Sequence, residues 1–230
     1  MFKQRGQSMT EFLIILPILL FLILGALQII FIYQAKTTLN YATYEAARAG
    51  TLENAQLEAV QNGFSRGMAP FFTRPTTDDD TKKSQAVIQA RDIVKSQIDS
   101  QLVRFERINP TKSSFDTFGK DVGRGVIEIP NNHLLFRNAS VIDNNGLSIQ
   151  DANLLKIRIT YCMDLIVPFA NKIIETAAFS LLDTSKPDAE FEVDCMSSDE
   201  SSRIPIVSHT IMRMQSPAQS CPGCFANTSY

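Results

Sequence analysis

The sequence contains no tryptophan, only two histidines (His133 and His209), and no excess of basic residues. Motifs for a serine-hydrolase nucleophile, a phosphate-binding loop or a zinc-protease helix are also absent from it. Its net charge of −2 gives no electrostatic reason to expect nucleic-acid binding. We therefore predict no catalytic residues, no metal, no cofactor and no nucleic-acid partner.

A long apolar run is the strongest feature that the chain does have. Residues 12–32 contain a single polar side chain, Gln28, and as a helix they would extend about 32 Å, close to one bilayer core. A cleaved secretory signal is the alternative, but its apolar region is normally shorter. Lys3 and Arg5 precede the run, which favours a cytoplasmic N-terminus and a periplasmic domain after Ile32.

All four cysteines follow the apolar run, on the side expected to be oxidising, so we expect two disulfides. Three pairings are possible, and we favour Cys162–Cys195 with Cys221–Cys224. The Cys221-Pro222-Gly223-Cys224 spacing would also suit a redox dithiol or half of a zinc site. No helix pattern follows it, and only two histidines could complete a zinc site, so a structural disulfide is preferred.

Helical periodicity continues beyond the apolar run. One apolar stripe recurs every three or four residues and predicts a helix over residues 10–49 that ends at Gly50. The stripe is alanine-rich, which would permit close packing against another helix. Pro17 falls in the first turns, where it removes one backbone hydrogen bond. The stripe consists of Ile32, Ala35, Leu39, Ala42, Ala46 and Ala49.

Further helices are predicted over residues 53–66, ending near Gly67 and Pro70, over residues 81–108 and over residues 168–182. Leu102 and Phe105 are assigned to the apolar stripe of the 81–108 helix.

Strands are predicted from alternating patterns, with a turn at residues 143–146. The predicted strands cover residues 125–129, 155–162, 190–195 and 204–214. The acidic face of the 190–195 segment would suit pairing with the basic face of the 155–162 strand. The whole is an α+β fold, in which a long N-terminal transmembrane and amphipathic helix precedes helices and a small antiparallel sheet.

A lone carboxylate, Glu11, stands at the start of the apolar run. Burying it at membrane depth would cost a few kcal/mol. If the chain were cut after Gly6, the free α-amine of Gln7 would lie within a helical turn of Glu11 and could neutralise a neighbour's carboxylate. An ordinary acidic residue favoured by the dipole at a helix start is the simpler alternative.

The N-terminal sequence resembles TadE-like minor pseudopilins of tight-adherence (Tad, type IVc) pili. The resemblance rests on residues 5–12, on Leu16-Pro17 and on residues 44–49, Tyr-Glu-Ala-Ala-Arg-Ala. General secretion-pathway pseudopilins share the glycine and the glutamate, but residues 7–10 depart from their pattern. Later segments at 157–161 and 204–216 are similar to strands of the TadE-like family, though less specifically.

The resemblance implies cleavage between Gly6 and Gln7 by a prepilin peptidase, which gives a leader (1–6), an assembly helix (7–50) and a periplasmic α+β domain (51–230). It assigns Glu11, Phe12 and Pro17 to assembly. Expected partners are that peptidase, other major and minor pilins, the inner-membrane assembly platform and membrane lipid. The expected location is the inner membrane, with entry into the extracellular pilus left open.

Two other functions remain open from the sequence alone. The chain could be a membrane-anchored periplasmic thiol oxidoreductase that uses Cys221 and Cys224. It could also be a signal-anchored binding protein that is never processed and keeps residues 1–6.

Overall fold

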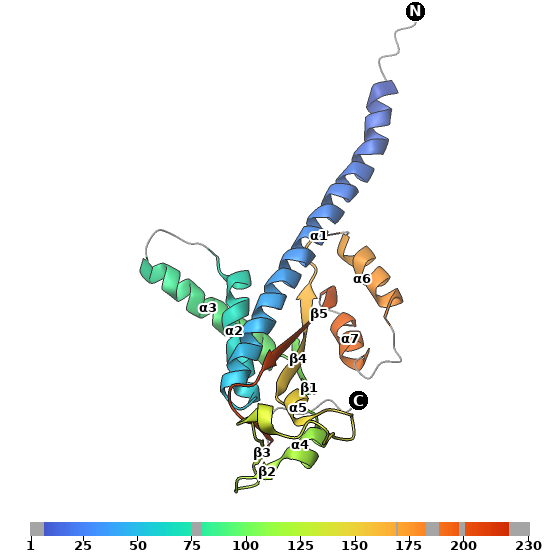
Figure 1. Cartoon of the computed structure of the whole chain (residues 1–230). Coiled ribbons are helices and arrows are strands. Elements are labelled where there is room, and N and C mark those ends of the chain that lie inside the picture. Colours follow the sequence, from blue (N-terminus) through green and yellow to red (C-terminus); the bar gives the residue numbers. More distant parts are fainter. Residues whose placement is uncertain (1–6, 75–79, 169, 183–188, 198–200, 221–230) are drawn as a thin grey trace, which may run out of the picture. The chain divides into compact units, whose positions relative to one another are not determined.

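The computed structural model describes residues 7–74, 80–168, 170–182, 189–197 and 201–220 (Figure 1). Within them lie seven α-helices, one short 3-10 helix and six strands. In chain order these are α1 (Gln7–Leu52), α2 (Leu57–Phe72), α3 (Asp80–Asp99), β1 (Val103–Asn109), α4 (Lys112–Phe118), β2 (Lys120–Asp121), β3 (Ile127–Ile129), η1 (Leu134–Phe136), α5 (Ile149–Ala152), β4 (Leu154–Asp164), α6 (Ala170–Ser180), α7 (Ala189–Met196), β5 (Arg203–Arg213) and β6 (Ala218–Ser220). The predicted α+β class, with its long N-terminal helix and antiparallel sheets, is confirmed.

The chain forms two compact units that are discontinuous in sequence. Unit 1 combines residues 1–35 with residues 162–205, and unit 2 combines residues 36–161 with residues 206–230. The long helix α1 and the strands β4 and β5 therefore contribute residues to both units. These units differ from the division into a 7–50 helix and a 51–230 domain that the sequence suggests.

Helix α1 is 46 residues long, which corresponds to about 69 Å, and Pro17 lies inside it. The predicted apolar stripe is present, because Ala35, Leu39, Ala42 and Ala46 are all completely buried. The expected end at Gly50 is wrong. The helix continues to Leu52, and the turn that follows places Asn54 and Ala55 at φ values of 57° and 56°.

Helix α2 begins later and extends further than predicted. It runs from Leu57 to Phe72 and passes through both Gly67 and Pro70, which were expected to lie at or beyond its end. Gly67 is a helix interior residue here because it faces Ala42 of α1, where a side chain would not fit. Pro70 lies in the last turn, where it removes one backbone hydrogen bond two residues before the helix ends at Phe72.

The predicted 81–108 helix is wrong in its last third. Helix α3 ends at Asp99, and Gln101 adopts a left-handed backbone with φ 58°. Leu102 N then donates to Gln97 O at 3.0 Å and closes the helix terminus. The following residues form β1, with Val103 paired to Tyr161 and Phe105 paired to Ile159 of β4. Leu102 and Phe105 therefore do not belong to a helical stripe.

The larger sheet has the strand order β1-β4-β5, and β1 and β4 are antiparallel. The predicted 155–162 strand is confirmed as β4, and the 204–214 segment as β5, an edge strand that accommodates Pro205. Leu155, Ile157 and Ile159 are completely buried on one face of β4. The smaller sheet, in the order β2-β3-β6, contains the predicted 125–129 strand as β3 and includes β6, which the sequence did not indicate.

The predicted 190–195 strand is wrong, because residues 189–196 form helix α7. Its proposed pairing with the basic face of β4 is wrong too. The two edges of β4 are occupied by β1 and β5. Arg158, on the basic face of β4, forms an ion pair with Glu106 of β1, which also pairs with Arg104. The helix predicted over residues 168–182 is confirmed as α6, and the turn at residues 143–146 is present, with Gly146 at φ 75°.

Candidate functional site

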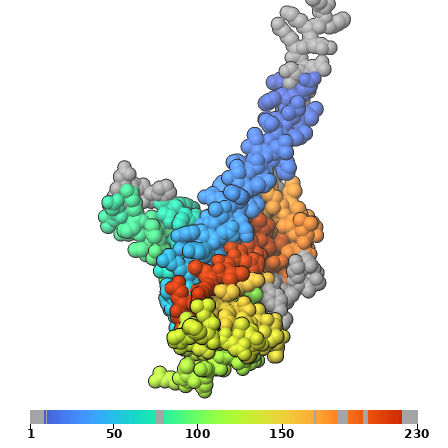
Figure 2. Space-filling view, in the orientation of Figure 1, coloured from blue at the N-terminus to red at the C-terminus, as the bar shows by residue number. Residues whose placement is uncertain are grey.

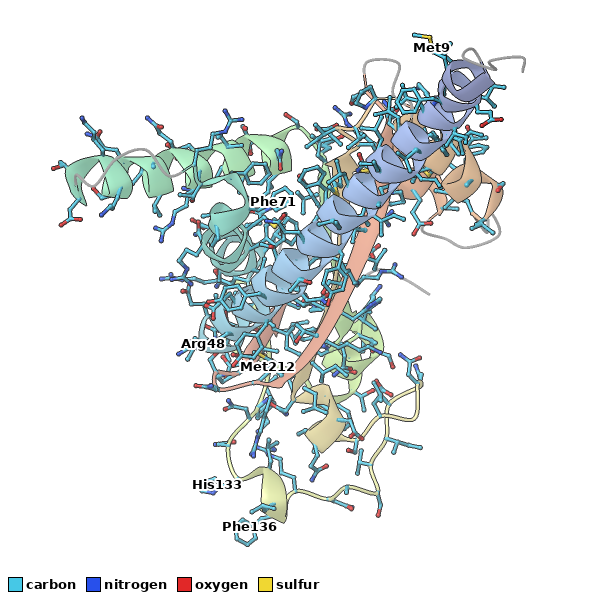
Figure 3. The ribbon with its side chains drawn as sticks, turned by 90° about the horizontal axis from the view of Figure 1, so that it is seen from above. Met9, Arg48, Phe71, His133, Phe136 and Met212 are labelled. Atoms are coloured by element: carbon cyan, nitrogen blue, oxygen red, sulfur yellow. A yellow bond between two sulfur atoms is a disulfide. The ribbon has the colours of Figure 1, made fainter. Side chains whose placement is uncertain are left out.

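The first half of α1, which begins near Met9 in Figure 3, presents apolar side chains to its surroundings over successive turns. In the space-filling view its first turns carry no other described segment on the visible face (Figure 2). Among the described residues α1 contains one segment long and apolar enough to cross a membrane, within residues 11–52. Its exposed large apolar side chains are Met9, Phe12, Leu13, Ile14, Ile15, Leu16, Ile18, Leu19, Leu20, Phe21, Leu22, Ile23, Leu27, Ile29, Ile30 and Phe31.

The predicted assembly residues all lie at the start of this surface. Glu11, Phe12 and Pro17 are exposed on α1, and the helix continues through Pro17 without interruption. Gln7 is the first residue of α1, whereas Gly6 lies outside the described residues. A carboxylate is therefore exposed on the second turn of an otherwise apolar helix, where it is available to a neighbouring molecule.

Gln28 is the residue of this helix that the sequence analysis noted but did not explain. It is completely buried, and its Oε1 accepts a hydrogen bond from the backbone N of Val167 at 2.9 Å. Its Nε2 has no hydrogen-bond partner among the described residues. The single polar residue in the apolar run thus connects α1 to the segment before α6, within unit 1. The signal for this contact in the sequence was that Gln28 is the only polar residue of the apolar run.

The second half of α1 packs closely on α2 through small residues, within unit 2. A Cβ built at Gly63 would lie 2.7 Å from the backbone oxygen of Glu45 and 2.9 Å from the Cα of Ala46. At Gly67 it would lie 2.5 Å from the Cα of Ala42. The alanine stripe is therefore used for helix packing inside this chain, and the glycines of α2 are the partners that the sequence analysis missed.

The structure joins Cys162, in β4, to Cys195, in α7, with a Cα–Cα distance of 5.7 Å. Both cysteines are buried in unit 1, where the bond ties α7 to the end of the strand. Cys221 and Cys224 lie outside the described residues. The structure therefore contains the first of the two favoured pairs, and the second stays a prediction.

His209 and Arg107 are the charged groups of unit 2 with shifted pKa values. Burial, followed by the nearby charges of Arg158, Lys156 and Lys36, lowers the pKa of His209, and Glu106 opposes this shift. Burial lowers the pKa of Arg107 to about 10, and its guanidinium lies 5.0 Å from the ring centroid of Phe115.

An open cleft of about 330 Å³ lies between α2 and α3. Its charged lining residues are Glu53, Arg66, Arg91 and Lys95, all of which are exposed. Over the ranges that the structure describes, histidine, cysteine, aspartate and glutamate form no cluster that could hold a metal ion. The cleft is polar and mixed in charge, and it carries no arrangement typical of a catalytic centre.

The N-terminal helix is also similar to a known protein family. Residues 6–48 match the family model of TadE-like proteins. This segment of the chain is TadE-like. Searches of curated proteins and of solved structures found no match.

The match covers the exposed apolar turns, Glu11, Gln28 and most of the alanine stripe of α1. The TadE-like segment supports a pilin-like protein associated with Tad pili, and the single apolar helix suggests a membrane anchor. The TadE-like segment and its surroundings are therefore the candidate functional site.

Proposed function

We propose that this chain is a minor pseudopilin that acts in the assembly of a Tad (type IVc) pilus. In this function the first half of α1 anchors the precursor in the inner membrane and later packs against the same region of other pilins. The chain after Ile32 remains on the periplasmic side. The observation that carries the proposal is the TadE-like match over residues 6–48, which coincides with an exposed apolar helix.

Processing is the first step of the proposal. A prepilin peptidase cleaves between Gly6 and Gln7, removing a leader that contains Lys3 and Arg5. One observation supports this position: the family match begins at residue 6, directly before the proposed cleavage point. Cleavage there leaves a mature chain that starts directly with a helix and carries a free α-amine at Gln7.

Assembly then depends on Glu11. Its carboxylate is exposed among apolar neighbours. Placing this charge in the membrane is energetically unfavourable unless a positive charge compensates it. The α-amine of a neighbouring mature pilin supplies that charge when the two N-terminal helices lie side by side. The apolar side chains around Glu11, beginning with Phe12, provide the rest of the contact. Assembly partners are thus other major and minor pilins and the inner-membrane platform that inserts them.

The N-terminal peptide of the protein, isolated from membranes of its native host, tests this function. Mass spectrometry of a proteolytic digest should find Gln7, rather than Met1, at the N-terminus. A Gly6→Leu variant should retain residues 1–6, because a small residue is required at the cleavage site. A matched Gln4→Leu variant, inside the leader, should still be cleaved, which would attribute the failure to the cleavage site.

Other outcomes favour the alternative functions. An intact leader in the wild-type protein would indicate an unprocessed signal-anchored binding protein and would overturn the processing step. Cleavage near residue 35 would indicate a secreted domain without its anchor. A thiol oxidoreductase would require Cys221 and Cys224 for turnover, whereas a pilus protein should retain its N-terminal processing when both are replaced by alanine.

A further inference from the structure

Unit 1 contains a second apolar surface, on α6 and the segment that precedes it. Ala170, Ile173, Ile174, Ala177 and Ala178 recur at alternating spacings of three and one, and Leu181 continues the series. In a helix these positions form one continuous stripe. Lys172, Glu175 and Thr176 lie on the other side, and the first two form an ion pair at 3.1 Å. Helix α6 is therefore amphipathic.

Protein does not cover this stripe completely. Ile173 is 55% exposed and Leu181, just beyond the helix, is 84% exposed. Ile166, in the segment before α6, is 69% exposed, whereas its neighbours Leu165 and Val167 are buried. The backbone around Ile166 is held in place, because Leu165 N donates to Ser202 O at 2.8 Å. Ile166 is thus presented outward by a backbone that is anchored at Leu165.

The hydrogen bond between Val167 and Gln28 fixes the level of this segment along the membrane helix. Gln28 lies 17 residues after Glu11, which corresponds to about 26 Å along the helix, whereas a bilayer core is about 30 Å thick. If the core begins next to Glu11, Gln28 lies close to its outer boundary. A tilt of α1 would only place Gln28 deeper. Ile166 is consequently at the depth where hydrocarbon meets the lipid headgroups.

We propose that Ile166 and the apolar stripe of α6 insert into the outer leaflet surface of the bilayer, as a second membrane contact of the precursor. The inference rests on the membrane anchoring of α1, which is part of the proposed function. Helices with one apolar and one polar face commonly lie in this interfacial plane. Lipid is the occupant that the structure favours, because the hydrogen bond from Val167 to Gln28 holds the segment before α6 against the proposed membrane helix.

The attraction is apolar rather than electrostatic. Lys172 and Glu175 compensate each other on α6, and the nearby helix α7 carries the acidic residues Glu190, Glu192 and Asp194. Anionic lipid would therefore provide no attraction, and the contact should form on zwitterionic phosphatidylcholine and persist at high salt.

The absence of tryptophan from the chain permits a direct test. In an Ile173→Trp variant the introduced residue is the only tryptophan of the full chain. The variant is reconstituted in phosphatidylcholine vesicles whose acyl chains are brominated, and these chains quench tryptophan fluorescence only on contact. The expected result for Ile173→Trp is quenching close to that of a Leu19→Trp reference in the membrane helix. Leu181→Trp should be quenched to the same extent as Ile173→Trp. This second variant shows whether the result at Ile173 comes from a local structural change caused by the substitution.

Phe179→Trp is the matched control, because Phe179 is 52% exposed but lies on the side of α6 opposite the stripe. It should remain unquenched. Quenching of Leu19→Trp without quenching of Ile173→Trp and Leu181→Trp would overturn the inference and leave the anchor intact. Quenching of Phe179→Trp equal to that of Ile173→Trp would contradict the proposal that the stripe side of α6 faces the lipid. Failure of Leu19→Trp to be quenched would contradict the membrane anchor itself and, with it, this contact.

Discussion

Gly67 of α2 lies so close to Ala42 of α1 that a Cβ added at Gly67 would be 2.5 Å from the Ala42 Cα. The contact is between backbones, so rotation of a side chain cannot relieve it. One turn earlier, Gly63 is in the same relationship to Ala46. The two helices approach closely because small residues face each other on both, as in other tightly packed helix pairs.

Gly67→Ala should therefore destabilise unit 2. Replacing a helical glycine by alanine normally stabilises a helix by about 1 kcal/mol. Here the clash with the Ala42 backbone outweighs that gain, and we expect a net loss of about 1 to 3 kcal/mol in the free energy of unfolding. Chemical denaturation of the full chain in detergent micelles, followed by circular dichroism, measures it.

Gly25→Ala is the control for this substitution, because a Cβ at Gly25 meets no atom within 4 Å. It should leave the stability of unit 2 unchanged. If Gly67→Ala were as stable as the wild-type protein, the close approach of α1 and α2 described here would be wrong.

The periodicity of α1 identified its buried residues, but it could not identify what they contact. Ala35, Leu39, Ala42 and Ala46 were predicted as one stripe, and all four are buried. The expected helix end at Gly50 failed because glycine is used there for packing. A Cβ at Gly50 would lie 2.8 Å from Val60 Cγ2. Local sequence does not distinguish a glycine that ends a helix from one that makes room for a neighbour.

The disulfide between Cys162 and Cys195 should contribute strongly to unit 1. It closes a loop with a sequence separation of 33 residues. Loop-closure entropy predicts a stabilisation of about 3 to 4 kcal/mol for a loop of this size. Cys162→Ala with Cys195→Ala should lower the stability of unit 1 by an amount of this order, measured by hydrogen exchange in α7.

Two comparisons make this result specific. Wild-type protein treated with a thiol reductant should show the same loss of protection in α7. Cys221→Ala with Cys224→Ala should leave that protection in place. Equal protection of α7 in the Cys162 and Cys195 double variant and in the wild-type protein would contradict a stabilising role for the bond.

Stability should also depend on pH through His209. Burial and the charges of Arg158, Lys156 and Lys36 lower its pKa in the folded protein. The unfolded chain, with an ordinary histidine pKa of about 6.5, then binds more protons as the pH falls below that value. The free energy of unfolding should decrease on acidification from about pH 7 towards pH 5.5, before most carboxylates titrate.

His209→Gln should flatten this dependence, as measured by thermal unfolding across the same pH range. His133→Asn removes the other histidine, and asparagine tolerates its left-handed backbone at φ 52°. This second variant should keep the dependence of the wild-type protein. An unchanged slope in His209→Gln would show that another group is responsible.

The wrong assignments in the sequence analysis share a physical cause. Leu102 and Phe105 fit a helical spacing, yet they follow Gln101, whose left-handed backbone nothing in the sequence indicates. Phe191 and Val193 alternate like strand residues, yet β1 and β5 already occupy both sides of β4. In both cases the secondary structure is decided by contacts with residues far away in the sequence, which a local pattern does not reveal. The role of Gln28 could not be predicted for the same reason, because its partner Val167 is 139 residues away.

Glu11→Ala tests the assembly step directly. The variant should be synthesised, processed and inserted in the membrane, because the apolar run is unchanged and hydrophobicity drives insertion. It should fail to support pili, because no carboxylate remains to pair with the α-amine of a neighbouring Gln7. Electron microscopy and shear-release of pili from a chromosomal Glu11→Ala strain measure this.

The charge, rather than the size, of Glu11 is what the proposal requires. Glu11→Gln should therefore fail as Glu11→Ala does, although it keeps the shape of the side chain. Glu58→Gln removes another exposed carboxylate, from the first turn of α2, and should leave piliation normal. Normal piliation in both Glu11 variants would eliminate charge pairing as the basis of assembly. The exposed apolar turns of α1 would then have to carry the helix contacts alone.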